Sequence, residues 1–376
     1  MGNSFFIPPE AYKYIYTIVI GFIGLIYYDY LVGRPAKNII GRPVKSNYGI
    51  IFLAVVVILF IGLRPISAAF SDMLGYADMY NNFIYRDSDK GEIGLWWLAE
   101  LCHMLGFNST IWFLTVCAAY YGFTLKSAKL LFPNNWDYIF ITFLIAFSTL
   151  TYATNGIRNG LATASLLLGM ALFITPKDKK KYISLLFLAY AYLTHKSVIV
   201  PIACFFVSYY FLDFKKSIYF WIFSIFISLT VGDAVSNVFV DLGFDDRLEG
   251  YLIDADHSGF SHAGFRWDFI LYSIMPIWLG YYILVKKGIH NRIYEVLLST
   301  YVLANAFWVM VIRAQFSDRF AYLSWFMYAI VVTYPLFSID IWGNKQGRIA
   351  RNILYAHLSF TIFMNLIYYT FLKNVL

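Results

Sequence analysis

Residues 139–174 read IFITFLIAFSTLTYATNGIRNGLATASLLLGMALFI, and this stretch holds a single charged residue, Arg158. Two apolar runs, each close to the length that crosses a bilayer, flank the short polar connection NGIRNG at 155–160. An α-helix satisfies its own backbone hydrogen bonds, so it is the structure that such runs adopt in lipid. The stretch therefore predicts two membrane-spanning helices that meet at a tight turn.

The composition extends this interpretation to the whole chain. Of its 376 residues, 60% are hydrophobic, 21% are aromatic and only 14% are charged, whereas a soluble domain carries about 25% charged residues. No cleavable signal peptide is visible in the first residues, so we expect the first span to be retained. We predict an all-α polytopic integral membrane protein, a single transmembrane domain over residues 1–376. The sequence favours about twelve spans: 11–32, 48–65, 109–125, 136–154, 159–175, 182–195, 197–212, 217–237, 267–285, 292–312, 319–336 and 352–371.

Charge sets the orientation of these spans. Eighteen of the 29 Lys and Arg residues fall in six connections that lie on one face, which the positive-inside rule makes cytoplasmic. All six connections lie on the same side of the membrane only if one further segment does not cross the bilayer. This segment is residues 92–107, EIGLWWLAELCHMLGF. We predict that they form an interfacial or re-entrant helix on the outer face, where loops 64–108 and 241–268 would contribute to a site.

The outer face is rich in arginine where the inner face is rich in lysine. The inner lysines set topology and meet anionic headgroups, but outer arginines oppose that signal, so another role should favour them. The planar fork of arginine matches phosphate oxygens in bidentate fashion. The outer arginines are Arg64, Arg86, Arg158, Arg247, Arg266, Arg313 and Arg319.

Two of these arginines begin inward-running spans. Arg158 and Arg319 are placed at helix N-termini, where free N–H groups and the helix dipole favour anions. Gly156 and Gly160 flank Arg158 and would allow a ligand close to the backbone. The lipid-linked phosphate or pyrophosphate of a membrane substrate would sit at this depth. Arg158 could instead only snorkel from a helix end to the interface.

Other polar residues are also open to structural explanations. His195, between two spans in LTHKS (193–197), could be a hydrogen-bonded structural histidine. Asp78 could cap or pair within a solvated loop. Cys102, Cys117 and Cys204 are isolated in apolar stretches and are interpreted as core residues. In the predicted outer loop, His257 and His262 are loosely spaced, which argues against a metal site there.

The order of these residues resembles the EpsG-like branch of the Wzy-type bacterial polysaccharide polymerases. The resemblance covers most of the chain, although each motif is short. Asn159 follows Arg158 where the family pattern has Gln. The matching pieces are Arg64 ahead of Gly75-x-x-Asp78-x-Tyr80, Glu92-x-Gly94 leading to Leu105-Gly106-Phe107-Asn108, Arg158 with Leu161-Ala162, His195-x-Ser197, and Arg319 opening a late aromatic span.

The resemblance implies a multi-pass protein of the bacterial inner membrane, with a GT-C-like glycosyltransferase architecture and a site facing the periplasm or exterior. Such enzymes extend O-antigen, capsule or exopolysaccharide chains. The growing glycan leaves undecaprenyl pyrophosphate and joins a hydroxyl of an incoming lipid-linked oligosaccharide repeat, without a nucleotide sugar. The implied partners are this lipid-linked substrate, membrane lipids, a flippase and a chain-length regulator. We expect no nucleic acid, no cofactor and no metal requirement.

The residues themselves fit that chemistry. Charge on the leaving group would be stabilised by arginine, and the acceptor hydroxyl would be activated by a base, for which His195 and Asp78 are the candidates. We favour His195, because a histidine exchanges a proton near neutral pH, and Glu92 and Asp78 would then orient sugar hydroxyls. The catalytic candidates are His195, Asp78 and Arg158, and the substrate-binding candidates are Arg64, Tyr80, Glu92, Arg247, Arg266, Arg313 and Arg319.

The sequence leaves two alternative functions open. An O-antigen-type ligase, moving a finished glycan from the same carrier to a different acceptor, would use the same arginines. A lipid-linked oligosaccharide flippase or transporter would usually bury charges near the bilayer midplane and show repeated halves. The charges here lie at span ends and no internal repeat is evident, which favours an enzyme over a transporter.

Overall fold

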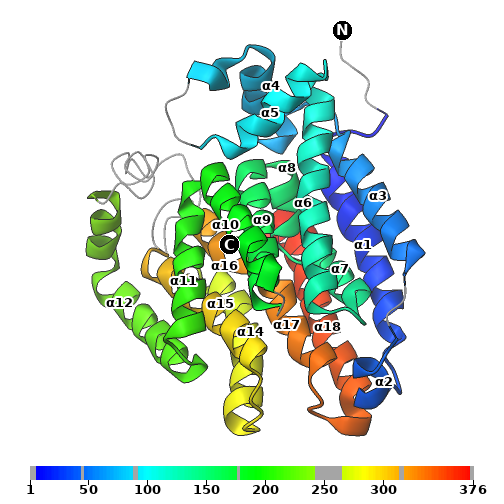
Figure 1. Cartoon of the computed structure of the whole chain (residues 1–376), viewed down its shortest axis with the longest axis vertical. Helices are drawn as coiled ribbons and strands as arrows, with labels where there is room; N and C mark the ends of the chain where they lie inside the picture. Colours follow the sequence, from blue (N-terminus) through cyan, green and yellow to red (C-terminus); the bar gives the residue numbers. More distant parts are fainter. Residues whose placement is uncertain are drawn as a thin grey trace. The chain divides into compact units, whose positions relative to one another are not determined.

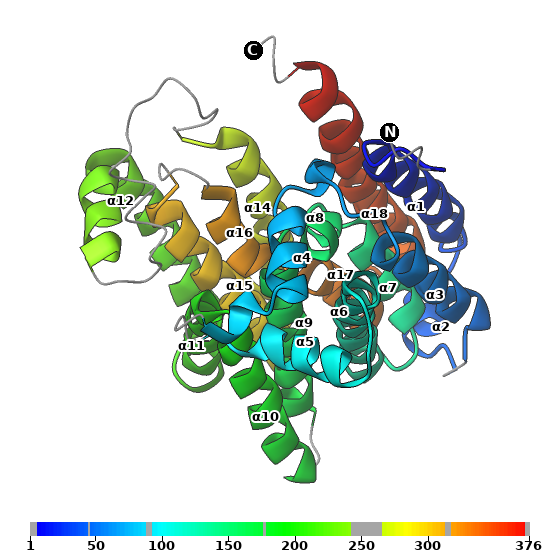
Figure 2. The ribbon, with the colours of Figure 1, turned by 90° about the horizontal axis from the view of Figure 1, so that it is seen from above.

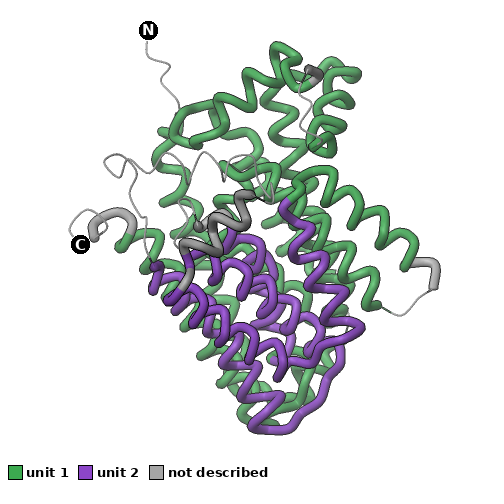
Figure 3. The backbone as a smooth tube through the Cα atoms, turned by 90° about the vertical axis from the view of Figure 1, so that its left-hand side faces the viewer, with its two compact units in different colours: residues 1–196, 336–376 green, residues 197–335 purple. Residues whose placement is uncertain are grey.

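The structure is a computed structural model of the chain, and it describes residues 6–43, 46–87, 92–175, 178–241, 265–312 and 317–372. Within these ranges every regular element is a helix (Figure 1), which confirms the predicted all-α class. The chain divides into two compact units, residues 1–196 with 336–376 (unit 1) and residues 197–335 (unit 2), coloured separately in Figure 3. Whether both units belong to one transmembrane domain stays a prediction.

Several helices have the length and polarity of membrane spans. Among the described residues, five helical stretches are long and apolar enough to cross a bilayer, and four further apolar helices are shorter. The protein is therefore membrane-embedded, while the count of twelve spans stays a prediction. The five are Ala11–Asp29 (α1), Ile157–Ile174 (α9), Trp267–Lys286, Arg292–Met310 (α15) and Phe320–Ser338.

Unit 1 is built around α9. This helix packs against three neighbours, α6, α8 and α10, and its side chains are buried on every side from Gly160 to Phe173, as expected of a helix that is apolar all round. The other helices of the unit are α2 (Ala36–Ile40), α3 (Tyr48–Gly62), η1 (Ala68–Phe70), α4 (Met73–Asn81), η2 (Ile84–Asp87), α5 (Gly94–Met104), α6 (Ser109–Leu131), α7 (Trp136–Ile145), α8 (Thr149–Thr154), α10 (Asp178–Thr194), η5 (Gly343–Lys345), α18 (Gln346–Ile362) and the π-helical η6 (Phe363–Leu372).

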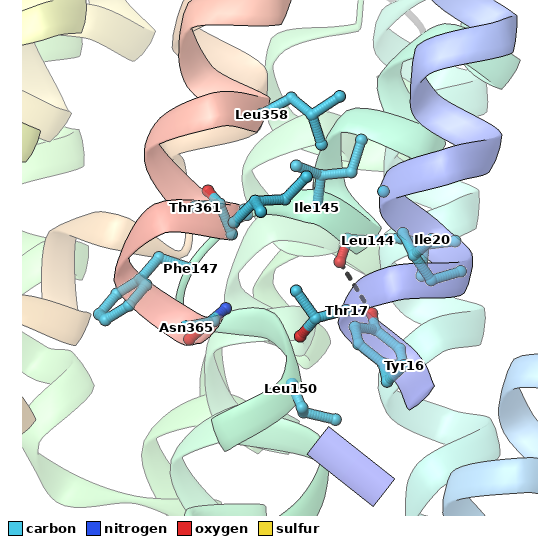
Figure 4. Close-up of a pocket in the computed structure, with 13 residues that line it drawn as sticks. Tyr16, Thr17, Ile20, Leu144, Ile145, Phe147, Leu150, Leu358, Thr361 and Asn365 are labelled. Atoms are coloured by element: carbon cyan, nitrogen blue, oxygen red, sulfur yellow. Dashed lines mark hydrogen bonds between the residues drawn. The ribbon is translucent and has the colours of Figure 1, made fainter. Parts of the chain in front are cut away.

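The span predicted at 136–154 is interrupted. It consists of α7 and α8, with non-helical backbone between them, and backbone of this kind at membrane depth must find hydrogen-bond partners inside the protein. The hydroxyl of Tyr16 donates to the carbonyl of Leu144 over 2.8 Å, and that of Thr149 donates to the carbonyl of Phe143. A small pocket opens at the break, between α1, the α7–α8 break and the end of α18 (Figure 4).

Residues 92–107 form the short helix α5. Its 11 residues span about 16 Å, roughly half the thickness of a hydrocarbon core; that residues 92–107 do not cross the bilayer stays a prediction. One face packs inward through Leu95, Ala99 and Cys102, and the other exposes Trp97 and Leu101. Together with α4, it covers the end of unit 1 where α8 and α9 meet (Figure 2). Its position at the outer membrane face stays a prediction.

A buried ion pair ties α7 to the segment that precedes α3. Asp137, only 2% exposed, accepts two hydrogen bonds from Arg42, at 2.8 and 2.7 Å, and one from Asn47 at 3.0 Å. The hydroxyl of Tyr27 also donates to this carboxylate. Removal of one partner would leave a buried charge uncompensated, so loss of either Asp137 or Arg42 should destabilise the packing of α7 against this segment.

Unit 2 is organised around α15. It contains α11 (Ile199–Tyr210), α12 (Phe214–Asp241), α14 (Trp267–Gly280) with the π-helical η4 (Tyr281–Lys286), α16 (Ser317–Trp325) and most of α17 (Tyr328–Ser338); η3 (Lys196–Val198) precedes α11. A buried polar network fixes the packing of these helices. Asn305 accepts from the indole of Trp221 at 2.8 Å and donates to Ser273 and Ser324, both at 3.0 Å. Every polar group of the Asn305 side chain is thus satisfied from neighbouring helices.

Candidate functional site

Three of the predicted site residues meet in one ion-pair cluster in unit 1. Glu92 lies between Arg158 and His195: its Oε2 accepts from Arg158 Nη1 at 2.6 Å, and its Oε1 is 2.8 Å from His195 Nδ1. The backbone N–H of Lys196 also donates to Oε1, at 3.1 Å. The three side chains are 11–18% exposed, so they are largely withdrawn from water and remain reachable. We call these residues, with Tyr76, the Glu92 cluster.

Arg158 is held in place by the α8–α9 turn and by α4. It lies in the first turn of α9, and its Nε donates to the hydroxyl of Tyr76 at 3.0 Å. Gly160 makes the turn possible, because a Cβ there would lie 2.5 Å from the carbonyl oxygen of Tyr152. The close approach at Gly160 is therefore to the protein itself, while a Cβ at Gly156 would meet nothing nearer than 3.9 Å.

Glu92 and His195 come together because α5 and α10 pack closely. Gly94 begins α5, and a Cβ at this position would lie 2.2 Å from Oγ1 and 2.9 Å from the Cα of Thr194. Tyr190, one turn before, donates its hydroxyl to the Gly94 carbonyl at 3.1 Å. Glu92 precedes this contact by two residues and His195 follows it by one, so the glycine contact sets the distance between their side chains.

The electrostatics of the cluster define which nitrogen of His195 can act as a base. Burial alone would raise the pKa of Glu92, but the hydrogen bond and charge of His195, the charge of Arg158 and the Lys196 N–H lower the pKa to about 2. Glu92 is therefore ionised at working pH and can only accept hydrogen bonds. In the neutral form of His195, Nδ1 then carries the proton and the lone pair is on Nε2. Among the described residues, Nε2 has no hydrogen-bond partner.

Two other predicted residues, on the same end of unit 1, lie outside the cluster. Asp78 is exposed on α4, where its carboxylate accepts from the side chain of Asn82 at 2.6 Å. Tyr80 is 1% exposed: its ring is stacked between His103, at 3.9 Å, and Trp112, at 4.9 Å, and its hydroxyl donates to a backbone carbonyl. The described contacts give Tyr80 a packing role. The roles predicted for Asp78 as a base and Tyr80 as a substrate ligand stay predictions.

Arg64 is buried to 99%, and its predicted role as a substrate ligand stays a prediction. Its guanidinium donates to the carbonyls of Ile61, at 2.8 Å, and Thr154, at 2.7 Å, which end α3 and α8. It also lies over the rings of Phe70 and Phe113, at 5.2 and 5.5 Å. One cation thus caps two helix C-termini, where the dipole favours positive charge. This arrangement fixes the start of the α8–α9 turn that carries Arg158.

The roles predicted for the remaining arginines as substrate ligands stay predictions. Arg247 and Arg313 lie outside the described residues, and Arg319 is described only as part of the backbone of α16. Arg266 belongs to unit 2, where Asp268 accepts from it at 2.9 and 2.7 Å and Phe269 packs against its guanidinium at 3.7 Å. Arg266 is thus already paired with a neighbouring carboxylate.

Sequence reasoning did not find three contributors to the cluster. They are the hydroxyl of Tyr76, the backbone N–H of Lys196 and the missing side chain of Gly94. Tyr76 and Gly94 were within the motifs that suggested the site, but only the packing of α4, α5 and α10 identifies their partners. The part of the chain that the structure describes contains no group of three or more His, Cys, Asp or Glu side chains able to hold a metal.

Comparison with known proteins identifies a family. The profile of the EpsG family matches residues 47–375, which is nearly the whole chain and includes every residue of the Glu92 cluster. The comparison with curated proteins found no match, and the comparison with solved structures found none either.

Proposed function

The chain belongs to the EpsG family, which indicates a membrane polysaccharide polymerase of the glycosyltransferase type, and we propose a specific reaction for it. A growing glycan is transferred from undecaprenyl pyrophosphate to a hydroxyl of an incoming lipid-linked oligosaccharide repeat. The reaction takes place at the outer face of the bacterial inner membrane and needs no metal. Twelve spans and a GT-C-like architecture belong to the same proposal, as do a flippase and a chain-length regulator as partners.

The Glu92 cluster is the observation that supports this reaction. It combines a cation for a diphosphate, Arg158, with a base, His195, and both contact one carboxylate. Arg158 lies in the first turn of α9, so the helix N-terminus adds its own positive potential. A diphosphate leaving group needs such stabilisation where charge develops in the transition state.

The atoms balance in a single displacement. The oxygen of the acceptor hydroxyl forms a bond to the anomeric carbon of the donor sugar, and the bond from that carbon to the phosphate oxygen breaks. The hydroxyl proton passes to Nε2 of His195, which holds the lone pair. The diphosphate leaves with both electrons of the broken bond and is stabilised by Arg158.

A reconstituted polymerase assay tests the proposal. The full chain in nanodiscs is given one undecaprenyl-pyrophosphate oligosaccharide repeat from the native host, with chelator and without nucleotide sugar, and products are separated on a gel. We expect a ladder spaced by one repeat, which is lost in Arg158→Ala and in His195→Ala. Arg348→Ala, an exposed arginine on α18, is the matched control and should leave the ladder intact.

The other outcomes identify the rival functions. Normal ladders from both cluster variants would refute the assignment of these residues. A single addition of the glycan to an unlike acceptor would identify a ligase. Movement of the intact lipid-linked repeat across a vesicle bilayer, with no ladder, would identify a transporter.

A further inference from the structure

Glu92 occupies the position on Arg158 that the proposed donor needs. We infer that donor binding and base activation are coupled through Glu92: the donor's diphosphate takes Arg158 from Glu92, which is then left to act on His195 alone. This inference rests on the proposed function and adds a positioning residue and an order of events to it. The sequence had suggested only that Glu92 would orient sugar hydroxyls.

The first step is an exchange of partners on Arg158. At present Nη1 of Arg158 donates to Glu92 at 2.6 Å and Nε to the hydroxyl of Tyr76 at 3.0 Å. A diphosphate carries more negative charge than one carboxylate and presents oxygens that a guanidinium binds in bidentate fashion. Because Arg158 is only 11% exposed, water competes weakly for it. The diphosphate can therefore replace Glu92 while Tyr76 keeps the guanidinium in position.

The second step is the effect on His195. Once Arg158 turns to the donor, the hydrogen bonds to Glu92 that remain among the described residues come from the Nδ1–H of His195 and the N–H of Lys196. The hydrogen bond from Nδ1–H to the carboxylate then strengthens, and Nε2 gains affinity for a proton. Residues with other ionisable side chains also contribute to this site: Lys196, which begins η3 and donates its backbone N–H, Tyr190 on α10 and Tyr76 on α4.

The coupling has a functional consequence. Before the donor binds, the ion pair with Arg158 partly neutralises the charge of Glu92 and weakens its hydrogen bond with His195. In this state His195 is a weaker base and has little tendency to activate water or a free hydroxyl. After the donor binds, the leaving group and the base are prepared together. The device thus limits the deprotonation of water or of an acceptor hydroxyl before the donor binds, and it does not by itself protect a bound donor from water when no acceptor is present.

The test is whether replacing Glu92 changes pyrophosphate binding and kcat in opposite directions. Inorganic pyrophosphate is the probe for binding by titration calorimetry, and the gel ladder gives kcat and the KM for the lipid-linked repeat across pH 5–9. In Glu92→Gln, Arg158 is no longer paired with a carboxylate that pyrophosphate must displace. We therefore expect pyrophosphate to bind several-fold more tightly than in the wild type. We also expect kcat to fall by roughly 10²–10⁴-fold with an altered pH profile. A purely structural role for Glu92 would weaken both.

A second measurement does not depend on a variant that folds poorly. With ¹⁵N-histidine labelling, pyrophosphate added to the wild-type chain should shift the ring nitrogens of His195, assigned by comparison with His195→Gln. In Arg158→Ala the same addition should leave them unchanged. No shift in the wild type, or weaker pyrophosphate binding in a folded Glu92→Gln, would overturn the coupling. A wild type that binds pyrophosphate with the expected shift but forms no ladder would refute the proposed polymerase and leave the exchange standing.

Discussion

Replacing Gly94 with alanine tests how the cluster is assembled. The added Cβ would lie 2.9 Å from the backbone Cα and N of Thr194, where ordinary contacts begin at 3.4 Å. The two backbones must therefore separate by at least about 0.5 Å (3.4 − 2.9). The 2.2 Å contact with Thr194 Oγ1 adds to this, because that hydroxyl is already bonded to the Tyr190 carbonyl at 2.7 Å.

The separation reaches the functional residues directly. An opening of about 0.5 Å would lengthen the 2.8 Å contact between Glu92 and His195 to about 3.3 Å, near the limit of a useful hydrogen bond. Forcing a methyl group into a packed contact costs about 1–3 kcal/mol. Because a displacement of 1 Å in a catalytic group can cost about 10²-fold in rate, we expect Gly94→Ala to lose roughly 10-fold or more in kcat.

The assay measures thermal unfolding and the polymer ladder on the same nanodisc preparation. Gly122→Ala is the control: this glycine is also helical, but a Cβ there meets nothing within 4 Å. It should raise stability by up to about 1 kcal/mol, because alanine favours helix, and leave the ladder unchanged. A Gly94→Ala protein with wild-type melting temperature and kcat would show that the α5–α10 contact does not set the cluster geometry.

Three further outcomes are expected. Arg64→Lys should lower stability by about 1–3 kcal/mol in chemical unfolding, since one ammonium cannot reach both carbonyls that the guanidinium fork bonds. Asp137→Asn should cost about 2–3 kcal/mol by leaving Arg42 without its carboxylate, whereas Lys216→Ala, in an exposed pair, should change stability by less than about 1 kcal/mol. Because the pKa of Glu92 is lowered to about 2, its ionised form contributes stability that is fully present above pH ~4.5 and is lost as pH falls towards 2. The difference in melting temperature between the wild type and Glu92→Gln should therefore shrink as the pH falls through that window.

The candidate site was only partly predictable from the sequence. Arg158 and His195 stood out because a charge or an imidazole between apolar runs is expensive and needs a reason. Glu92 was identified as a site residue, but its partners lie 66 and 103 positions away. Nothing in local sequence states which distant cation a carboxylate will meet. That information enters only with the packing of α5, α9 and α10.

Arg64 and Tyr80 show the opposite case. Both stood in the motif order that suggested substrate contact, and the structure buries each to 99% with hydrogen bonds from the side chain to backbone carbonyls; their roles as substrate ligands stay predictions. A sequence records that a residue can bind phosphate or stack on a sugar. It does not record whether two helix ends or two aromatic rings have already occupied that residue.

The sequence by itself indicated that this protein is embedded in a membrane and that it is helical, and it predicted that residues 92–107 do not cross the bilayer. These follow from local composition, because apolar runs of membrane length must satisfy their own backbone and because charge is costly in lipid. Only the tertiary structure decided that α7 and α8 are separate helices, that Arg64 caps two of them, and that Glu92 joins Arg158 to His195. Each of these depends on contacts between segments far apart in the chain, whose geometry is set by side-chain packing and close glycine approaches.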